Sequence, residues 1–253
     1  MNEKGHSDQA ALRGEPSYVW RDGQVRRLTM IQKWAAGRER GIVLENGCGV
    51  GSYLKRLAAD AEFSVGLEVE FERGIEALNR LGRAKGGVVN AVGEHLPFAA
   101  ERFDLITSHE VLEHVQDDRA CMMEIIRTLK PGGRLILFVP NRWYPFETHG
   151  IYWKNRYFFG NKLFVNYLPR KLRDRLAPHV NVYTTSDLKR LIGGLPVRVI
   201  YHTVIFGAYD NIINRYPRFG KGLRSLLQWL EKTPLKIFGL SQFWVIEKTD
   251  TQG

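Results

Sequence analysis

The sequence predicts an α/β fold, a doubly wound and mostly parallel sheet with helices on both faces. Three observations support this prediction. The chain has 253 residues, 44% of them hydrophobic, which is enough for one large domain with a sizeable core. From Gly41 on, short apolar runs alternate with segments of helical periodicity. One of the first runs ends in a glycine-rich turn that opens a helix.

The first expected element is a helix from Gln24 to Ala36, where apolar residues repeat at helical spacing and Gly37 ends the pattern. Strands and helices then alternate. The expected strands are Ile42–Glu45, Ser64–Val69, Gly87–Val92, Phe103–Ser108 and Arg134–Val139, and the helices between them are Ser52–Ala59, Arg73–Gly82 and Arg119–Leu129. Strands joined in this way run parallel through right-handed crossovers, so a ligand is expected at their carboxyl ends.

After Pro140 the chain becomes irregular and aromatic as far as about Val180. A helix is expected at Thr184–Leu195, a strand at Val197–Phe206 and a last strand at Gln242–Glu247. The segment between these two strands, Gly207–Leu240, is far longer than a hairpin loop and forms a second insertion.

The net charge of +10 lies entirely in the second part of the chain. Residues 1–140 hold 19 Lys and Arg against 20 Asp and Glu, a net charge of −1, whereas residues 141–253 hold 18 against 7, a net charge of +11. An excess of this kind favours an acidic partner such as nucleic acid or an anionic membrane surface.

The two cysteines, Cys48 and Cys121, are too few for a disulfide framework, and no Cys and His spacing resembles a zinc site. We therefore expect no structural metal. The first ten residues are polar, and no apolar run approaches the 18 or more residues of a membrane span. These features predict a cytoplasmic protein, with contact to a membrane surface as an alternative.

The strongest chemical signal is the run Val43–Gly51, a buried strand with an acidic residue followed by a Gly-x-Gly-x-Gly turn. Glycines allow the backbone to approach a ligand closely and to adopt positive φ. Glu68 ends the next strand and can accept both hydroxyls of a ribose. Position 52 is Ser rather than a third glycine, so the turn fits a nucleoside without pyrophosphate better than a dinucleotide.

The motifs together resemble those of the class I S-adenosylmethionine-dependent methyltransferases, in particular the group that methylates small molecules and lipids. The motifs, in chain order, are Val43–Gly51, Val65–Glu68, Leu96–Phe98, Phe103–Ile106 with Val111–Val115, and Leu129–Arg134. This resemblance implies a Rossmann-like sheet with an antiparallel last strand. It also implies one methyltransferase domain over residues 24–253, with a cofactor half (41–141) and acceptor-side insertions (142–180 and 207–240).

The resemblance implies a cofactor site for S-adenosylmethionine built from Glu45, Gly47, Cys48, Gly49, Gly51, Glu68, Gly93, Glu94 and Ser108. Glu45 and the glycines would line its methionine end, and Glu68 would bind its ribose. The family usually has Asp where this chain has Val92, so the adenine would be met by Glu94 or by backbone. Residues 1–23 are expected to be a flexible segment, in which residues 18–21 form either a lid or a surface anchor.

Methyl transfer from a sulfonium mainly requires alignment, and a general base is needed only if the acceptor arrives protonated. Candidates for catalytic residues are His109, just past the fourth strand, and His149 in the loop after the fifth. Tyr144, Glu147 and His114 are candidates for substrate binding. His114 could equally be a packing residue at a helix start, and the aromatic loop could equally be an extension of the core.

Cations and aromatic residues are interleaved in both insertions. Ile151–Arg175 carries seven Lys and Arg against one Asp, and Gly207–Leu240 repeats the pattern. Such segments are typical of contact with lipid headgroups, which predicts a small-molecule or lipid-linked acceptor. Three alternatives remain: RNA-directed methylation through this basic surface, simple packing of amphipathic helices on the sheet, and a non-catalytic S-adenosylmethionine-binding protein.

Overall fold

A seven-stranded sheet forms the centre of the molecule, whose computed structural model describes residues 20–154 and 156–250. Its strands, in spatial order, are β10 (Val197–Ile205), β11 (Ser241–Lys248), β5 (Leu129–Pro140), β4 (Phe103–His109), β1 (Ile42–Asn46), β2 (Phe63–Glu68) and β3 (Gly86–Asn90). The five strands from β5 to β3 are parallel, and β11 is antiparallel to both of its neighbours. The predicted mostly parallel sheet with an antiparallel last strand is confirmed.

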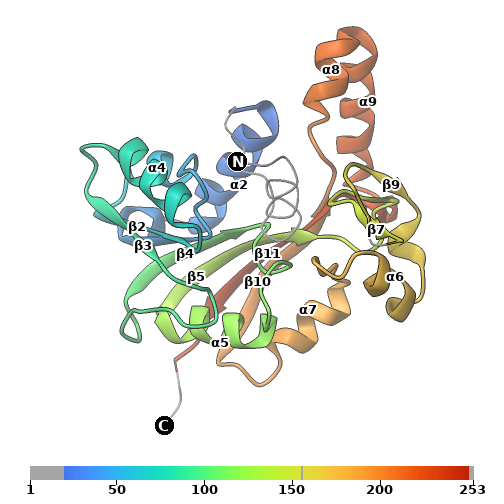
Figure 1. Ribbon diagram of the computed structural model, residues 1–253. Coiled ribbons are helices and arrows are strands. Elements are labelled where there is room, and N and C mark those ends of the chain that lie inside the picture. The colour runs from blue at the N-terminus through green and yellow to red at the C-terminus, as the bar shows by residue number, and fades with distance from the viewer. Residues whose placement is uncertain (1–19, 155, 251–253) are drawn as a thin grey trace.

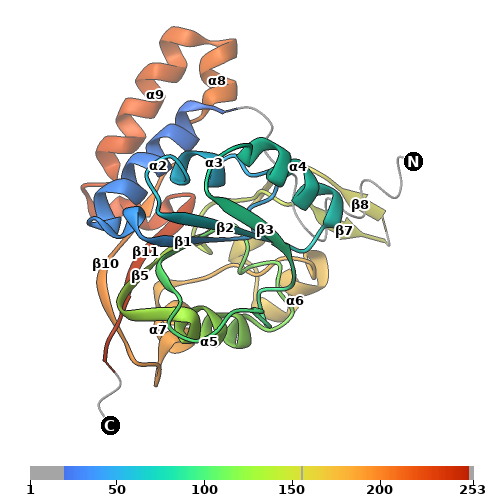
Figure 2. The same cartoon turned by 90° about the vertical axis from the view of Figure 1, so that its left-hand side faces the viewer.

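Helices cover both faces of this sheet (Figures 1 and 2). On one face lie α2 (Asp22–Ala35), α3 (Leu54–Leu57) and α4 (Phe71–Leu81), with the short 3-10 turn η1 (Arg38–Arg40) leading into β1. On the other lie α5 (Asp118–Thr128) and α7 (Thr185–Ile192). Neighbouring residues of β1 point to opposite faces of the sheet. Val43 belongs to the hydrophobic core beneath α2 and Leu44 to the core beneath α5, and both are fully buried. Burial on both faces explains why these strands read as continuous apolar runs.

Capping hydrogen bonds fix the starts of α5 and α7, the two helices on the second face of the sheet. The Asp117 side chain accepts a hydrogen bond from the backbone N–H of Ala120 at the start of α5. Thr184 and Asp187 form a reciprocal capping box at the start of α7. Such caps satisfy backbone N–H groups that have no partner inside the helix, which is why these helices begin where the sequence places them.

Two predicted elements differ from the structure. The helix expected at Ser52–Ala59 is α-helical only from Leu54 to Leu57. Just past its end, the N–H groups of Ala59 and Asp60 bond to carbonyls three residues back instead of four. The strand expected from Arg134 begins at Leu129, where it pairs with Phe103 across an irregularity in the register.

The two insertions form separate small units beside the sheet. The first contains β6 (Phe146–Glu147), β7 (Ile151–Trp153), β8 (Arg156–Phe158), β9 (Lys162–Leu163), η2 (Val165–Tyr167) and α6 (Arg170–Leu176). The second contains α8 (Asp210–Arg215), α9 (Pro217–Leu230) and η3 (Pro234–Phe238). Gly220 of α9 allows close packing on α8, since a Cβ there would lie 2.7 Å from the Cα of Ile213.

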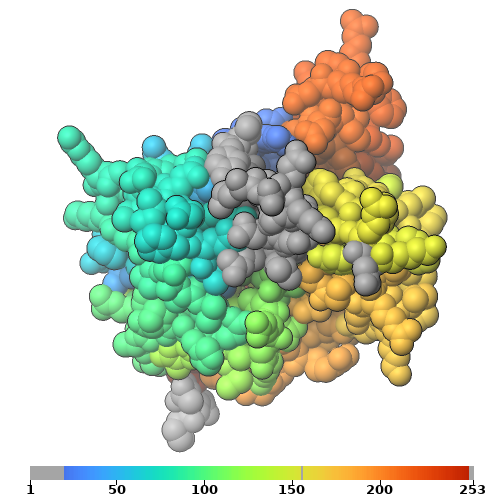
Figure 3. Space-filling model, viewed as in Figure 1, coloured from blue at the N-terminus to red at the C-terminus, as the bar shows by residue number. Residues whose placement is uncertain are grey.

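The α8–α9 pair projects from the body of the protein, and the first insertion lies beside its base (Figures 1 and 3). The predicted N-terminal segment falls largely on residues 1–19, which lie outside the described residues. Trp20 is described, and its ring packs edge-on against Tyr53 at a centroid distance of 5.0 Å. Within residues 20–154 and 156–250, no helix combines the length and the apolar character needed to cross a membrane.

Candidate functional site

A cavity of about 1290 Å³ opens where the parallel strands end. Its walls come from the loops after β1, β2, β3, β4 and β5, as expected for a doubly wound sheet, and from both insertions. Pockets that hold one small ligand typically measure about 300–1,000 Å³. The cavity is therefore large enough for two molecules side by side.

The glycine turn after β1 forms the floor of one half of this cavity. Gly47 and Gly49 both have positive φ, and a Cβ on Gly47 would lie 2.3 Å from a methyl carbon of Val111. Cys48 also lines the cavity and fixes the turn through its N–H, which donates to the Leu67 carbonyl. Gly51 does not line the cavity: a Cβ there would meet Ala77 of α4, so this glycine serves packing rather than ligand contact.

Glu68, at the end of β2, holds the same turn from the side. Its carboxylate accepts hydrogen bonds from the N–H groups of Gly49 and Glu70, at 2.8 and 2.9 Å. A carboxylate offers about four acceptor positions, so two remain for a ligand. Because Glu68 lines the cavity, these positions fit a pair of ribose hydroxyls.

Glu45 is a buried acid at the bottom of the cavity. Its Oε2 has no hydrogen-bond partner among the described residues, and burial raises the pKa of its carboxyl well above the ordinary value. A buried carboxyl oxygen without a partner is costly unless a positive or hydrogen-bonding group meets it. The position therefore suits a ligand that carries an ammonium or another cationic group.

Two further predicted cofactor residues, Gly93 and Glu94, line the same half of the cavity from the loop after β3. Gly93 lines the cavity, and a Cβ there would lie 2.9 Å from the sulfur of Cys121. Glu94 also lines it and accepts a hydrogen bond from the N–H of Gln116. Val92, which stands in place of the family's Asp, is 42% exposed and presents an apolar side chain to the same wall. Adenine contact by these residues stays a prediction.

Ser108 does not reach the cavity, whereas His109 does. Ser108 is fully buried away from the cavity, and its hydroxyl accepts a 3.4 Å hydrogen bond from Asn46. His109 lines the cavity, but burial, followed by the charge of Arg27, lowers the pKa of its imidazole to about 3. A base this weak does not accept protons efficiently at neutral pH, so the geometry argues against His109 as a general base.

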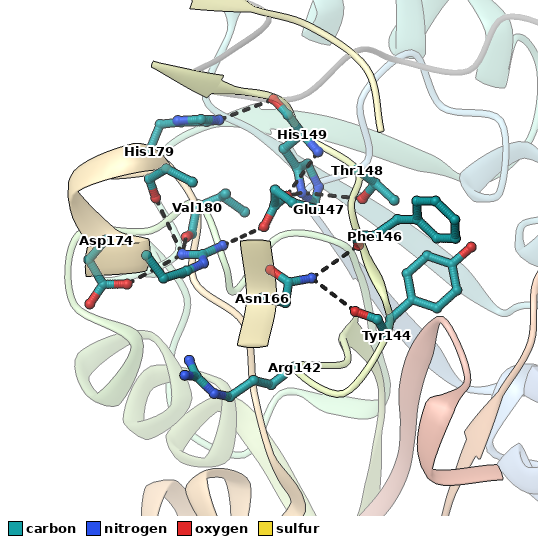
Figure 4. Close-up of polar contacts among 12 residues, drawn as sticks. Arg142, Tyr144, Phe146, Glu147, Thr148, His149, Asn166, Asp174, His179 and Val180 are labelled. Carbon is teal, nitrogen blue, oxygen red and sulfur yellow. Dashed lines mark hydrogen bonds and ion pairs between the residues drawn. The ribbon is translucent and has the colours of Figure 1, made fainter. Parts of the chain in front are cut away.

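The loop after β5 supplies another wall of the cavity, and Figure 4 shows Tyr144, Glu147 and His149 on it. Tyr144 and His149 line the cavity from this loop. Glu147 also borders the cavity but is 1% exposed, and its oxygens are used by His149 and Arg173. Glu147 therefore lies behind His149 and supports it, which differs from the substrate contact expected from the sequence.

His114 lies next to His149, with ring centroids 5.3 Å apart, and burial lowers the pKa of His114 to about 4. One polar atom from each of Glu113, His114 and His149 lies within 4.8 Å of the others. Carboxylates and imidazoles also bind divalent metals, so the expectation of a metal-free site stays a prediction. Burial and then the nearby Glu110 raise the pKa of Glu113 well above its ordinary value.

Sequence reasoning missed the ion pair that links α2 to this site. Glu110 has a φ of 53°, and its carboxylate binds Arg27 at 2.7 Å and the Ser241 hydroxyl at 2.9 Å. Burial alone would lower the pKa of Arg27, but Glu110 outweighs it and raises that pKa. The position of Glu110 beside His109 was an available signal, whereas nothing local points to Arg27, 83 positions away.

Comparison with known proteins agrees with this geometry. A family model described as a methyltransferase domain matches residues 44–137. Ubiquinone biosynthesis O-methyltransferase from Escherichia coli O157:H7 is 32% identical over 119 residues, which cover 46% of this chain and 50% of that protein. The chain thus spans about half the length of the curated relatives it matches.

Solved structures of low identity share the fold. The N-methyltransferase NodS from Bradyrhizobium japonicum WM9, solved with S-adenosyl-l-homocysteine, has a TM-score of 0.61 at 13% identity and covers 96% of this chain and 97% of its own. A putative sarcosine dimethylglycine methyltransferase from Galdieria sulphuraria has a TM-score of 0.61 at 15% identity, covering 98% and 99%. Residues 44–137 thus match a methyltransferase domain, and the sheet shares its fold with these solved structures.

Proposed function

We propose that the protein transfers a methyl group from S-adenosylmethionine to a small-molecule acceptor. The observation that carries this proposal is the unpaired, buried Oε2 of Glu45 in a cavity large enough for two molecules. A donor with a cationic methionine end and a ribose matches Glu45 at one point and Glu68 at another. The relatives described as methyltransferases support the same donor.

The donor supplies a methyl group that is already activated by the positive charge on its sulfur. The chain's own contribution is therefore mainly position and exclusion of water. Gly47 and Gly49 let the backbone come close to the donor, Glu45 and Glu68 fix its two ends, and the loop after β5 holds the acceptor opposite. Arg27 and Glu110 tie α2 to this edge of the sheet and close its side.

Calorimetry with S-adenosylmethionine and S-adenosyl-l-homocysteine tests the donor site. Hydrogen bonds to a charged group are worth about 1.5–3 kcal/mol each, so Glu68→Gln is expected to weaken binding about 100-fold or more. Glu72→Gln, an exposed acid of α4, serves as the matched control. A wild-type protein that binds neither compound would overturn the proposal. Binding without tritium transfer from the labelled methyl group into lipid or aqueous cell extracts would instead favour the non-catalytic alternative.

The surface of the two insertions supports a finer proposal, in which the acceptor is lipid-linked and is reached from an anionic membrane surface. Large apolar side chains on both are more than half exposed, among them Phe159, Phe164, Phe219 and Trp229. Exposed cations, including Arg156, Arg218 and Lys221, accompany them. Phe159 and Asp210 also line the cavity, so this surface reaches its mouth. Each cation near an anionic surface contributes about 1 kcal/mol.

Vesicle flotation tests the membrane part. The protein is expected to float with vesicles containing phosphatidylglycerol but not with pure phosphatidylcholine, and the double variant Phe219→Ser/Trp229→Ser is expected to lose most of this binding. Phe71→Ser, which removes a similarly exposed aromatic residue from α4, should leave it unchanged. An RNA gel shift at physiological salt without vesicle binding would favour RNA-directed methylation, and binding to neither would favour simple packing of the helices.

A further inference from the structure

We infer that His149 accepts a proton from the acceptor and that Glu147 and Arg173 hold it in the orientation and tautomer needed to do so. This inference rests on the proposed methyl transfer and deepens it. It assigns the acceptor to compounds whose methylated atom is an oxygen that arrives as a hydroxyl. His149 would be a catalytic residue, whereas Glu147 and Arg173 would be positioning residues.

The three side chains form a chain of contacts from the interior to the cavity. Figure 4 labels two of them, Glu147 and His149. Arg173 Nη2 donates to Glu147 Oε2 at 2.7 Å, and both side chains are only 1% exposed. The other oxygen, Oε1, lies 3.0 Å from His149 Nδ1 and also accepts the backbone N–H of His149 at 3.0 Å. A carboxylate bound in this way fixes both the ring and the loop that carries it.

The charge on Glu147 determines which nitrogen of His149 carries the proton. Burial alone would raise the pKa of Glu147, but His149 and Arg173 outweigh it and lower that pKa to about 2. The carboxylate is thus ionised at neutral pH and can only accept hydrogen bonds. Nδ1 must then be the protonated nitrogen, which leaves the lone pair on Nε2 of His149 free to take a proton.

The backbone around His149 is held as firmly as its ring. Its carbonyl accepts hydrogen bonds from the Tyr157 hydroxyl at 2.5 Å and from His179 Nε2 at 3.2 Å. The ring itself borders the cavity, and the side chain is 20% exposed. A base that is fixed in place but open to a ligand satisfies the geometric requirement for general base catalysis.

Other titratable groups also face His149. They are Glu147 and Tyr157 from its own insertion, Arg173 and His179 from α6 and the loop after it, and Glu110, Glu113 and His114 from the segment after β4. Of His109, His114 and His149, the first two have lowered pKa values, whereas His149 has an ionised carboxylate bonded to its ring.

The proposed step balances. As the acceptor oxygen forms its bond to the methyl carbon, its proton passes to Nε2 of His149. The bond from the methyl carbon to sulfur breaks, and its electron pair stays on sulfur. The positive charge that was on sulfur ends on the imidazole of His149, where the Glu147 carboxylate stabilises it. A base of this kind typically contributes a factor of about 10²–10⁴ in rate.

Nitrogen-15 NMR of imidazole-labelled protein tests the positioning without any acceptor. In the wild type, His149 is expected as the Nδ1–H tautomer, and Glu147→Gln is expected to lower the pH at which it becomes protonated. A wild-type Nε2–H tautomer, or a midpoint that Glu147→Gln leaves unchanged, would overturn the inference. Asp174→Asn is the matched control, because this 57% exposed carboxylate contacts Arg173 at 3.5 Å but does not touch His149.

Tritium transfer from labelled S-adenosylmethionine into lipid and aqueous cell extracts tests the chemistry. Glu147→Gln and His149→Gln are each expected to reduce the rate about 10²–10⁴-fold, and the double variant little further, while the affinity for S-adenosylmethionine stays within about twofold. A wild type that does not bind the donor would contradict the proposed function instead. Unchanged turnover in Glu147→Gln, or activity lost to a chelator and restored by a divalent cation, would contradict the inference alone.

Discussion

The two halves of the cavity are built in different ways. The half formed by residues 41–141 uses the ends of buried parallel strands, and the Glu68 carboxylate at the end of β2 holds the turn at Gly49 after the neighbouring β1. The half formed by the insertions uses short strands, loops and a buried ion pair between Glu147 and Arg173. After the roles proposed above, we call the first the donor half and the second the acceptor half. A single fold can carry different functions when its insertions differ.

The buried ion pair is the point at which the acceptor half is most easily broken. Removing one partner of a buried pair leaves an uncompensated charge, which typically costs about 3–5 kcal/mol. Arg173→Met is therefore expected to lower the free energy of unfolding by this amount, as measured by urea denaturation. The double variant Arg173→Met/Glu147→Met should recover most of the loss.

Arg170→Met provides the control for this prediction. Arg170 lies on the same helix and pairs with Asp187, but its side chain is 54% exposed, so its loss is expected to cost at most about 1 kcal/mol. Equal costs for the two arginines would show that burial of the ion pair does not govern the stability of the insertion.

In the donor half, the position most sensitive to substitution is Gly47. Gly47→Ala combines a positive φ with a contact of 2.3 Å to Val111, and is expected to destabilise the protein by about 2–4 kcal/mol and to abolish measurable donor binding. Gly37→Ala has a positive φ of 89° but no atom within 4 Å of the new Cβ. It should cost about 1–2 kcal/mol without affecting calorimetric binding.

The smallest of the three effects is a pH dependence of stability. Because the pKa of Glu45 is raised in the folded state, the native protein binds more protons than the unfolded chain above the ordinary Glu pKa of about 4.3. This acid therefore makes the free energy of unfolding fall as the pH rises from that value towards its folded pKa. Glu45→Gln is expected to flatten this fall by about 1–3 kcal/mol in urea titrations at pH 5 and pH 8. Parallel pH profiles for the two proteins would contradict the prediction.

Much of the donor half could be predicted from the sequence because its signals are local. A strand, a glycine turn and an acid at the next strand end lie within a short stretch, and a parallel sheet brings them to one edge. Two residues predicted to bind the cofactor do not line the cavity, and packing explains why. Gly51 and Ser108 carry the right pattern but are turned into the packing against Ala77 and Asn46.

The acceptor half could be predicted only in outline. Its residues were identified as aromatic, basic and placed after β5, and His149 was among the candidates. The role of Glu147 depends on Arg173, 26 positions away on a helix whose place in the fold no local pattern determines. In the same way, the weakness of His109 as a base follows from its near-complete burial beside Tyr53 and Phe138, which three-dimensional packing alone creates.

The position of β11 between β5 and β10 has a consequence for how the protein folds. β10 precedes β11 in the chain, yet in the described sheet it pairs only with β11. During synthesis the parallel strands can therefore associate first, while β10 has to wait for a later segment before it gains its hydrogen bonds. Since Leu240 and Ser241 at the start of β11 line the cavity, the binding site would be completed in one of the last steps of folding.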